Sequence, residues 1–111
     1  MKAFNRGGIY EEGPRTFSVE QSDYIEAVVL TAATLTRVPI PAGATVVLFS
    51  FGGDIWAKFG GVADSISIPS TTSTTGAAPE FNPNSRDIPA GATHVLLISE
   101  SSAKGSLSFY R

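Results

Sequence analysis

The chain has 111 residues, a formal net charge of -2, only 16% charged residues and no cysteine, so it fits one domain without disulfides, thiolate catalysis or cysteine-containing zinc sites. Its eight Lys and Arg residues are scattered, whereas nucleic-acid binding needs a clustered basic surface, and we expect no nucleic-acid partner. The apolar runs are far shorter than a membrane span, and we expect no membrane association.

Residues 1–14 are predicted to form an extended N-terminal arm, with a frayed terminus as the alternative. The arm has three glycines and a proline, and no apolar stretch typical of a secretory signal, so we expect the protein to stay where it is made or to leave as part of something larger. It also holds Phe4, Ile9 and Tyr10, more large apolar side chains than a disordered tail usually has. We predict that these three side chains enter pockets on an adjacent subunit.

From residue 15 to residue 111, hydrophobic residues recur with a period of two, which indicates half-buried strands. The clearest alternating segments are 16–20, 55–59 and 106–110. Residues 22–35 fit either a helix or a strand, and their many β-branched side chains favour the strand. About eight short strands separated by turn residues predict an all-β fold: an antiparallel β-sandwich of the jelly-roll kind.

The six residues Ile-Pro-Ala-Gly-Ala-Thr occur twice, at 40–45 and at 88–93. Proline at the second position of a type I turn and glycine at the fourth would make each copy a tight corner. An apolar strand follows each copy, at 46–51 and at 95–99. This pattern suggests strands that begin after similar corners, at related positions of two sheets. The structural turn residues are Pro41 and Gly43 in the first copy and Pro89 and Gly91 in the second.

Both of these strands are apolar on their two faces, although an antiparallel sheet normally exposes one face to water. Either the chain itself covers the outer faces, or they dock on another chain. Gly52-Gly53 is predicted to be a hairpin turn, and residues 69–87 a long loop that Phe81 anchors to the domain. Arg86 is expected to hold this loop through Asp54, Asp64 or Asp87.

Catalytic groups are few. His94 is the single histidine and has no carboxylate or nucleophile near it in the sequence, so we assign it a structural role. Asp54 and Asp64 form no motif of an acid–base pair. We therefore predict no catalytic, cofactor-binding or metal-binding residues. Trp56 has three interpretations: a core residue, an interface residue or a platform for a sugar ring.

The second half of the chain resembles small virion proteins of tailed bacteriophages. The similarity lies in "DIWAKFGG", "EFNPNSRDIPAGATHVLLIS" and the closing "LSFYR". In length and order of parts the chain is similar to the capsid decoration, or staple, proteins of short-tailed phages of the epsilon-fifteen type. The similar residues belong to the scaffold of the fold and not to a site.

The resemblance implies a jelly-roll sandwich on the outside of an icosahedral shell, where it bridges subunits of the major capsid protein against the pressure of packaged DNA. The expected partners are the major capsid protein and a second copy of the chain, as a homodimer. The expected interface residues are Phe4, Ile9, Tyr10, Trp56 and Tyr110, and the location is the virion surface after synthesis in the host cytoplasm. The alternative is a carbohydrate-binding module that uses Trp56 and Tyr110.

Overall fold

The protein is an all-β sandwich, as the sequence predicts. A computed structural model describes residues 1–4 and 20–111, which form eight strands in two antiparallel four-stranded sheets. Among these residues no helix is long and apolar enough to cross a membrane. The strands are β1 (Ile25–Leu30), β2 (Thr36–Pro39), β3 (Val46–Phe51), β4 (Trp56–Gly60), β5 (Glu80–Phe81), β6 (Ser85–Asp87), β7 (His94–Ile98) and β8 (Ala103–Tyr110).

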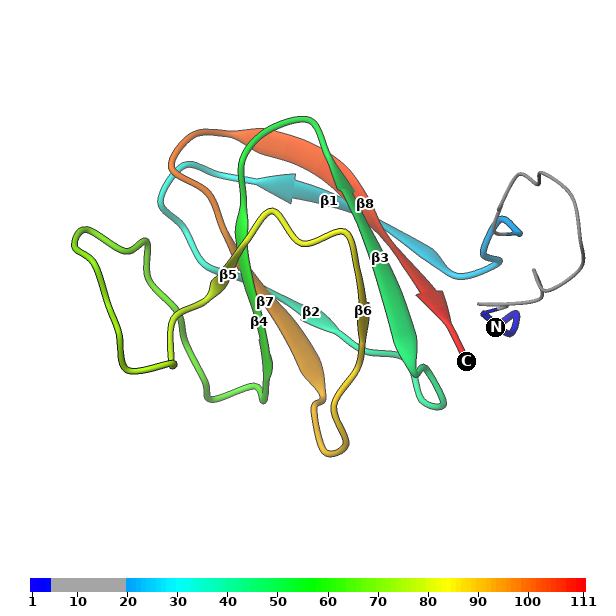
Figure 1. Cartoon of the computed structure of the whole chain (residues 1–111). Coiled ribbons are helices and arrows are strands. Elements are labelled where there is room, and N and C mark those ends of the chain that lie inside the picture. The colour runs from blue at the N-terminus through cyan, green and yellow to red at the C-terminus, as the bar shows by residue number, and fades with distance from the viewer. Residues whose placement is uncertain (5–19) are drawn as a thin grey trace, which may run out of the picture.

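The two sheets have the strand order of a jelly roll (Figure 1). Sheet A has the order β1-β8-β3-β6 and sheet B the order β2-β7-β4-β5. The first strand pairs with the last, the second with the seventh, the third with the sixth and the fourth with the fifth. The chain is thus one long antiparallel hairpin folded over itself, the arrangement of double-sheet jelly rolls.

The hydrophobic core fills the space between the two sheets. Alternate residues of the longer strands point inward, as the period of two predicts, and the largest fully buried side chain is Phe109. The ambiguous segment 22–35 contains strand β1, whose Val28 and Leu30 belong to the core. The buried core residues are Val28, Leu30, Val38, Val47, Ile55, Ala57, Val95, Leu97, Ala103, Leu107 and Phe109.

The two copies of the repeated hexapeptide are corners between the sheets, as the sequence suggests. The first connects β2 of sheet B to β3 of sheet A, and the second connects β6 of sheet A to β7 of sheet B. The predicted type of turn is wrong. Pro41 accepts from Ala44 at 3.2 Å and Pro89 accepts from Ala92 at 3.2 Å, so each proline is the first residue of its turn. The glycines, both at φ 88°, are the third residues, as in a type II turn.

Two other predicted connections differ from the structure. Gly52-Gly53 is not a hairpin turn, because β3 before it and β4 after it belong to different sheets. A connection between sheets needs the same permissive residues as a hairpin, so the pair of glycines cannot distinguish them. Residues 69–87 are not one loop either, since the short strands β5 and β6 lie inside it. The predicted strand at 16–20 lies almost wholly outside the described residues.

The apolar outer face of β7 is covered by the chain itself, which for this strand decides between the alternatives left open by the sequence. Leu96 and Ile98 on the outside of β7 are buried, and Asp64 and Ser65 line a cavity together with Leu96. The segment between β4 and β5 is held there by Lys58 Nζ, which donates to the carbonyl of Ala77 at 2.8 Å.

Candidate functional site

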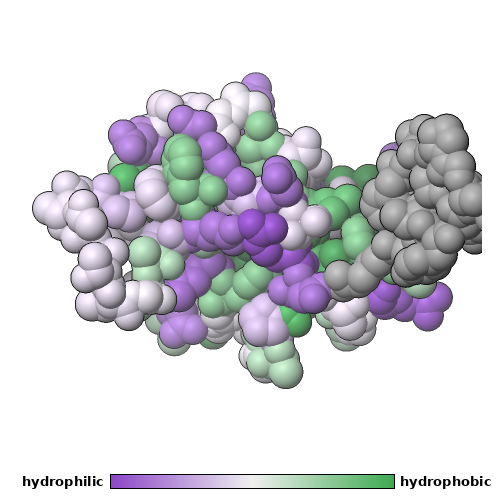
Figure 2. All heavy atoms as spheres, in the orientation of Figure 1, coloured by the Kyte–Doolittle hydropathy of each residue, from purple (hydrophilic) through white to green (hydrophobic). Residues whose placement is uncertain are grey.

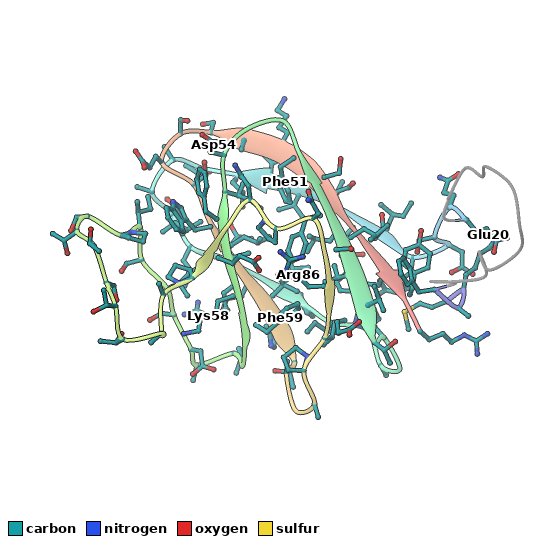
Figure 3. The ribbon with its side chains drawn as sticks, in the orientation of Figure 1. Glu20, Phe51, Asp54, Lys58, Phe59 and Arg86 are labelled. Atoms are coloured by element: carbon teal, nitrogen blue, oxygen red, sulfur yellow. The ribbon has the colours of Figure 1, made fainter. Side chains whose placement is uncertain are left out.

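The flank between β5 and β6, where both sheets end, is closed by an ion pair (Figure 3). Arg86 of sheet A donates through Nε to both carboxylate oxygens of Glu80 of sheet B, at 3.0 Å each, and its Nη2 also contacts Glu80. The predicted partners Asp54, Asp64 and Asp87 are not the ones that Arg86 binds in this pair. Figure 2 shows hydrophilic residues across the middle of this face, over β5 and β6. The ion pair therefore joins the two sheets at their open side.

The contact shifts both titrations in the direction that favours the charged forms. The hydrogen bond from Arg86 lowers the pKa of Glu80 below its usual 4.5, and the hydrogen bond to Glu80 raises the pKa of Arg86. The two side chains are still 43% and 46% exposed, so solvent screens their attraction. The pair stabilises the geometry of the flank more than the fold as a whole.

The residues just before β6 help to line a cavity of about 410 Å³, together with residues of β3 and of the connection from β3 to β4. Asp54 and Asn82 are held in one arrangement there. Asn82 Nδ2 donates to Asp54 Oδ1 at 2.9 Å, while Asn82 Oδ1 accepts from the backbone N–H of Ile55 at 2.8 Å. The residues that line the cavity include Phe49, Phe51, Asp54, Asn82, Pro83 and Asn84. A carboxylate and an amide next to aromatic rings can bind a ligand that has both hydroxyl groups and an apolar face.

The backbone of Asn82 has an unusual conformation, which helps to place its side chain beside Asp54. Its φ is +48°, and it is one of two non-glycine residues with positive φ in the described part of the chain. Asparagine tolerates the left-handed region better than most residues. This conformation accompanies a hydrogen bond from the backbone N–H of Asn82 to the carbonyl of Ile55, at 2.9 Å. The turn thus presents the Asn82 side chain toward Asp54.

Trp56 lies on the outer face of sheet B and packs against Phe81. The ring centroids are 4.7 Å apart at an interplanar angle of 49°, and Phe81 is 49% exposed. Ala57, the next residue, belongs to the core, so Trp56 points away from it. The prediction that Phe81 anchors its segment to the domain is confirmed. Trp56 is only partly buried, which leaves the aromatic pair of Trp56 and Phe81 on the surface.

Phe4 and Tyr110 meet within one chain, at the end of sheet A where the termini lie (Figure 1). Their rings form an edge-to-face contact with centroids 5.2 Å apart. Tyr110 is only 2% exposed and donates its hydroxyl to the carbonyl of Glu20. The expectation that Tyr110 offers a surface contact is therefore wrong, because Phe4 and Glu20 occupy that position. Ile9 and Tyr10 lie outside the described residues.

The first residues of the chain are docked on its end. Arg111 donates its backbone N–H to the carbonyl of Lys2 and accepts from the N–H of Phe4, both at 3.0 Å. Lys2 Nζ contacts Glu20 at 2.9 Å, and this hydrogen bond raises the pKa of Lys2. Lys2 and Phe4 thus bind the residue that follows β8 of the same chain, whereas the sequence predicts an arm that reaches another subunit.

Sequence reasoning missed the site formed by Asp54 and Asn82. The two residues are far apart in the chain. The Asn-Pro-Asn turn at 82–84, next to the end of a strand, is the sequence feature that could have indicated the site. Asp54 and Asp64, weighed as an acid–base pair, lie beyond opposite ends of β4. Within residues 1–4 and 20–111, no group of three or more His, Asp or Glu side chains is placed to hold a metal ion. In comparisons with known proteins, no family model, no curated protein and no solved structure matches this chain.

Proposed function

We propose that this protein is a structural virion protein that decorates the outside of a bacteriophage capsid and bridges subunits of the major capsid protein. The observation that supports the proposal is where the phage-like residues lie in the fold. Asp54, Asn82 and Arg86 come from those segments, and they order and close the open flank of the jelly roll. Contacts that join the two sheets would help the protein to resist the mechanical load on a capsid.

The aromatic pair of Trp56 and Phe81 is the proposed contact with the capsid. Partly exposed aromatic side chains held rigidly by a sheet are typical anchors of protein interfaces. Phe81 is 49% exposed and Trp56 supports it from the neighbouring strand. The two rings stand on the outer face of sheet B, which leaves sheet A available for a different contact.

The test is to mix the purified protein with undecorated capsids of its phage and to image where it binds. We expect the wild type to occupy regular positions on the shell and Phe81→Ala to bind at least about tenfold more weakly. Val62→Ala is the matched control, because Val62 is 69% exposed but lies outside the aromatic pair. A wild-type protein that does not bind capsids would refute the proposal, and equal binding by Phe81→Ala would refute the contact.

A second candidate function is carbohydrate binding, which the cavity beside Asp54 and Asn82 favours. A glycan array with the wild type would show one class of glycan bound, and Asp54→Ala would lose that binding, since the carboxylate would accept hydrogen bonds from sugar hydroxyls. Glycan binding without capsid binding would replace the first proposal. An array with no bound glycan would exclude the second.

A further inference from the structure

Strand β1 is an exposed edge of sheet A. Its six residues make it longer than the other edge strands, since β6 has three residues, β2 has four and β5 has two. No described strand pairs with its outer side. It contains no proline and no lysine, two residues that commonly protect such edges from pairing.

Three of the five exposed large hydrophobic side chains of the described residues lie at this edge. Ile25 is 43% exposed and Val29 is 66% exposed, and both point to the outer face of sheet A with Ala27 between them. Tyr24, immediately before the strand, is 41% exposed. Small hydroxyl side chains continue the same face on β8, where Ser108 lies beside Ile25 and Ser106 beside Ala27. Lys104, beside Val29, adds one positive charge at the end of this row.

Within the described part of the chain, the backbone N–H and C=O groups of Ile25, Ala27 and Val29 are free to form hydrogen bonds with a further strand. Phe109 donates its N–H to the carbonyl of Tyr24 at 2.9 Å, so Tyr24 directs its backbone toward β8. In an antiparallel pair this direction alternates, and residues 26, 28 and 30 therefore also face β8. The N–H and C=O groups of Ile25, Ala27 and Val29 point to the open side.

We propose that β1 pairs with β1 of a second copy of this chain, antiparallel and centred on Ala27, so that two sheets A join into one eight-stranded sheet. The two-fold axis places Ala27 opposite the partner's Ala27. It places Ile25 opposite the partner's Val29, and the reverse, so the exposed β-branched side chains cover each other.

The single charge of the strand restricts the register. Centring the pair on Glu26 would place two carboxylates directly opposite each other, which is unfavourable. Centring it on Ala27 places each Glu26 opposite the partner's Val28. A shift by one residue would also move the cross-strand partners of Ile25 and Val29, so the hydrophobic pattern and the charge select the same register. The inference concerns the free protein and is independent of capsid binding.

Cysteine cross-linking tests the register, because the chain has no cysteine of its own. Ala27→Cys should form an intermolecular disulfide under mild oxidation, since opposed residues lie within bridging distance. Ile25→Cys mixed with Val29→Cys should give only the mixed disulfide. Ser106→Cys is the control: it lies one strand further from the axis, so its two copies would be roughly 14 Å apart.

Sedimentation of the uncross-linked protein gives a second measurement. The wild type should be dimeric, and Val29→Lys should weaken the dimer by about tenfold or more while leaving circular dichroism unchanged. Val62→Lys, at a similarly exposed position away from β1, should not. A monomeric wild type whose Ala27→Cys variant stays unlinked would overturn the inference, as would a disulfide in Ser106→Cys at the same rate as in Ala27→Cys.

Discussion

Ile40 donates its backbone N–H to the carbonyl of Thr93 at 2.9 Å, which joins the first residue of one hexapeptide copy to the last residue of the other. The reverse contact is present too, from Ile88 to Thr45 at 2.7 Å. A shift of 48 residues, from Ile40 to Ile88, also carries the pair Val38–Val95 onto the pair Arg86–Val47. The two copies of the hexapeptide are therefore related by an approximate two-fold axis that exchanges the two sheets.

The corner glycines give the first prediction. Gly43→Val and Gly91→Val should each cost about 1–3 kcal/mol, because valine is strained at a φ of 88°. Position 91 is the cleaner test, since an added Cβ there meets no atom within 4 Å and only the backbone strain remains. Thermal unfolding measures the effect. Ala90→Val places the same side chain in the same turn at a residue without positive φ, and an equal loss there would refute the explanation.

Gly105 gives the second prediction, which concerns close packing of strands. A Cβ at this position would lie 2.1 Å from the carbonyl oxygen of Ser50 and 2.6 Å from Cα of Phe51. Both are backbone atoms and cannot move aside without displacing β3. We expect Gly105→Ala to cost about 3 kcal/mol in the free energy of unfolding, measured in urea. Gly52→Ala, whose Cβ would have ordinary contact at 3.7 Å, should be nearly neutral.

The ion pair between Glu80 and Arg86 predicts a dependence on pH. Because the pKa of Glu80 is lowered in the folded protein, its stabilising effect is present above pH 4.5 and is lost as the pH falls through the folded value. The effect should stay below about 1 kcal/mol, since both groups are partly exposed. Unfolding of Glu80→Gln and wild type should therefore differ at pH 7 and converge as the pH falls below the folded pKa of Glu80. A difference that grows on acidification would contradict this assignment. Glu100→Gln serves as the exposed control.

Phe4 gives the fourth prediction. Its contact with Tyr110 should make Phe4→Ala less stable than the wild type by about 1–2 kcal/mol in the isolated protein, from lost burial and a lost aromatic pair. Ala3→Ser, at an exposed neighbouring position, should have no effect. Should Phe4→Ala melt at the wild-type temperature, the ring would be free to bind another subunit, as the sequence suggested.

The parts of the fold that follow from local patterns were predictable, and those that depend on distant partners were not. Alternation of hydrophobic residues located β4 and β8, the apolar runs after the two corners located β3 and β7, and β-branched side chains favoured a strand at β1. The short strands β5 and β6 escaped notice because two or three residues show no period, and they exist only through pairing with β4 and β3. Arg86 shows the same limit for the site: its partner Glu80 is six residues away, but three aspartates were equally plausible until the two sheets were placed together.

Strand β8 occupies the middle of sheet A, between β1 and β3, although it is synthesised after the other seven. During synthesis, therefore, the two strands that flank it have no common neighbour until β8 emerges. Sheet A cannot be completed before β8 emerges, and until then β1 has no partner among the described strands. Pairing of β1 with β8 also joins segments far apart in the sequence, which favours folding in milliseconds to seconds over faster rates. A nascent chain of this design depends on its last strand for protection from aggregation.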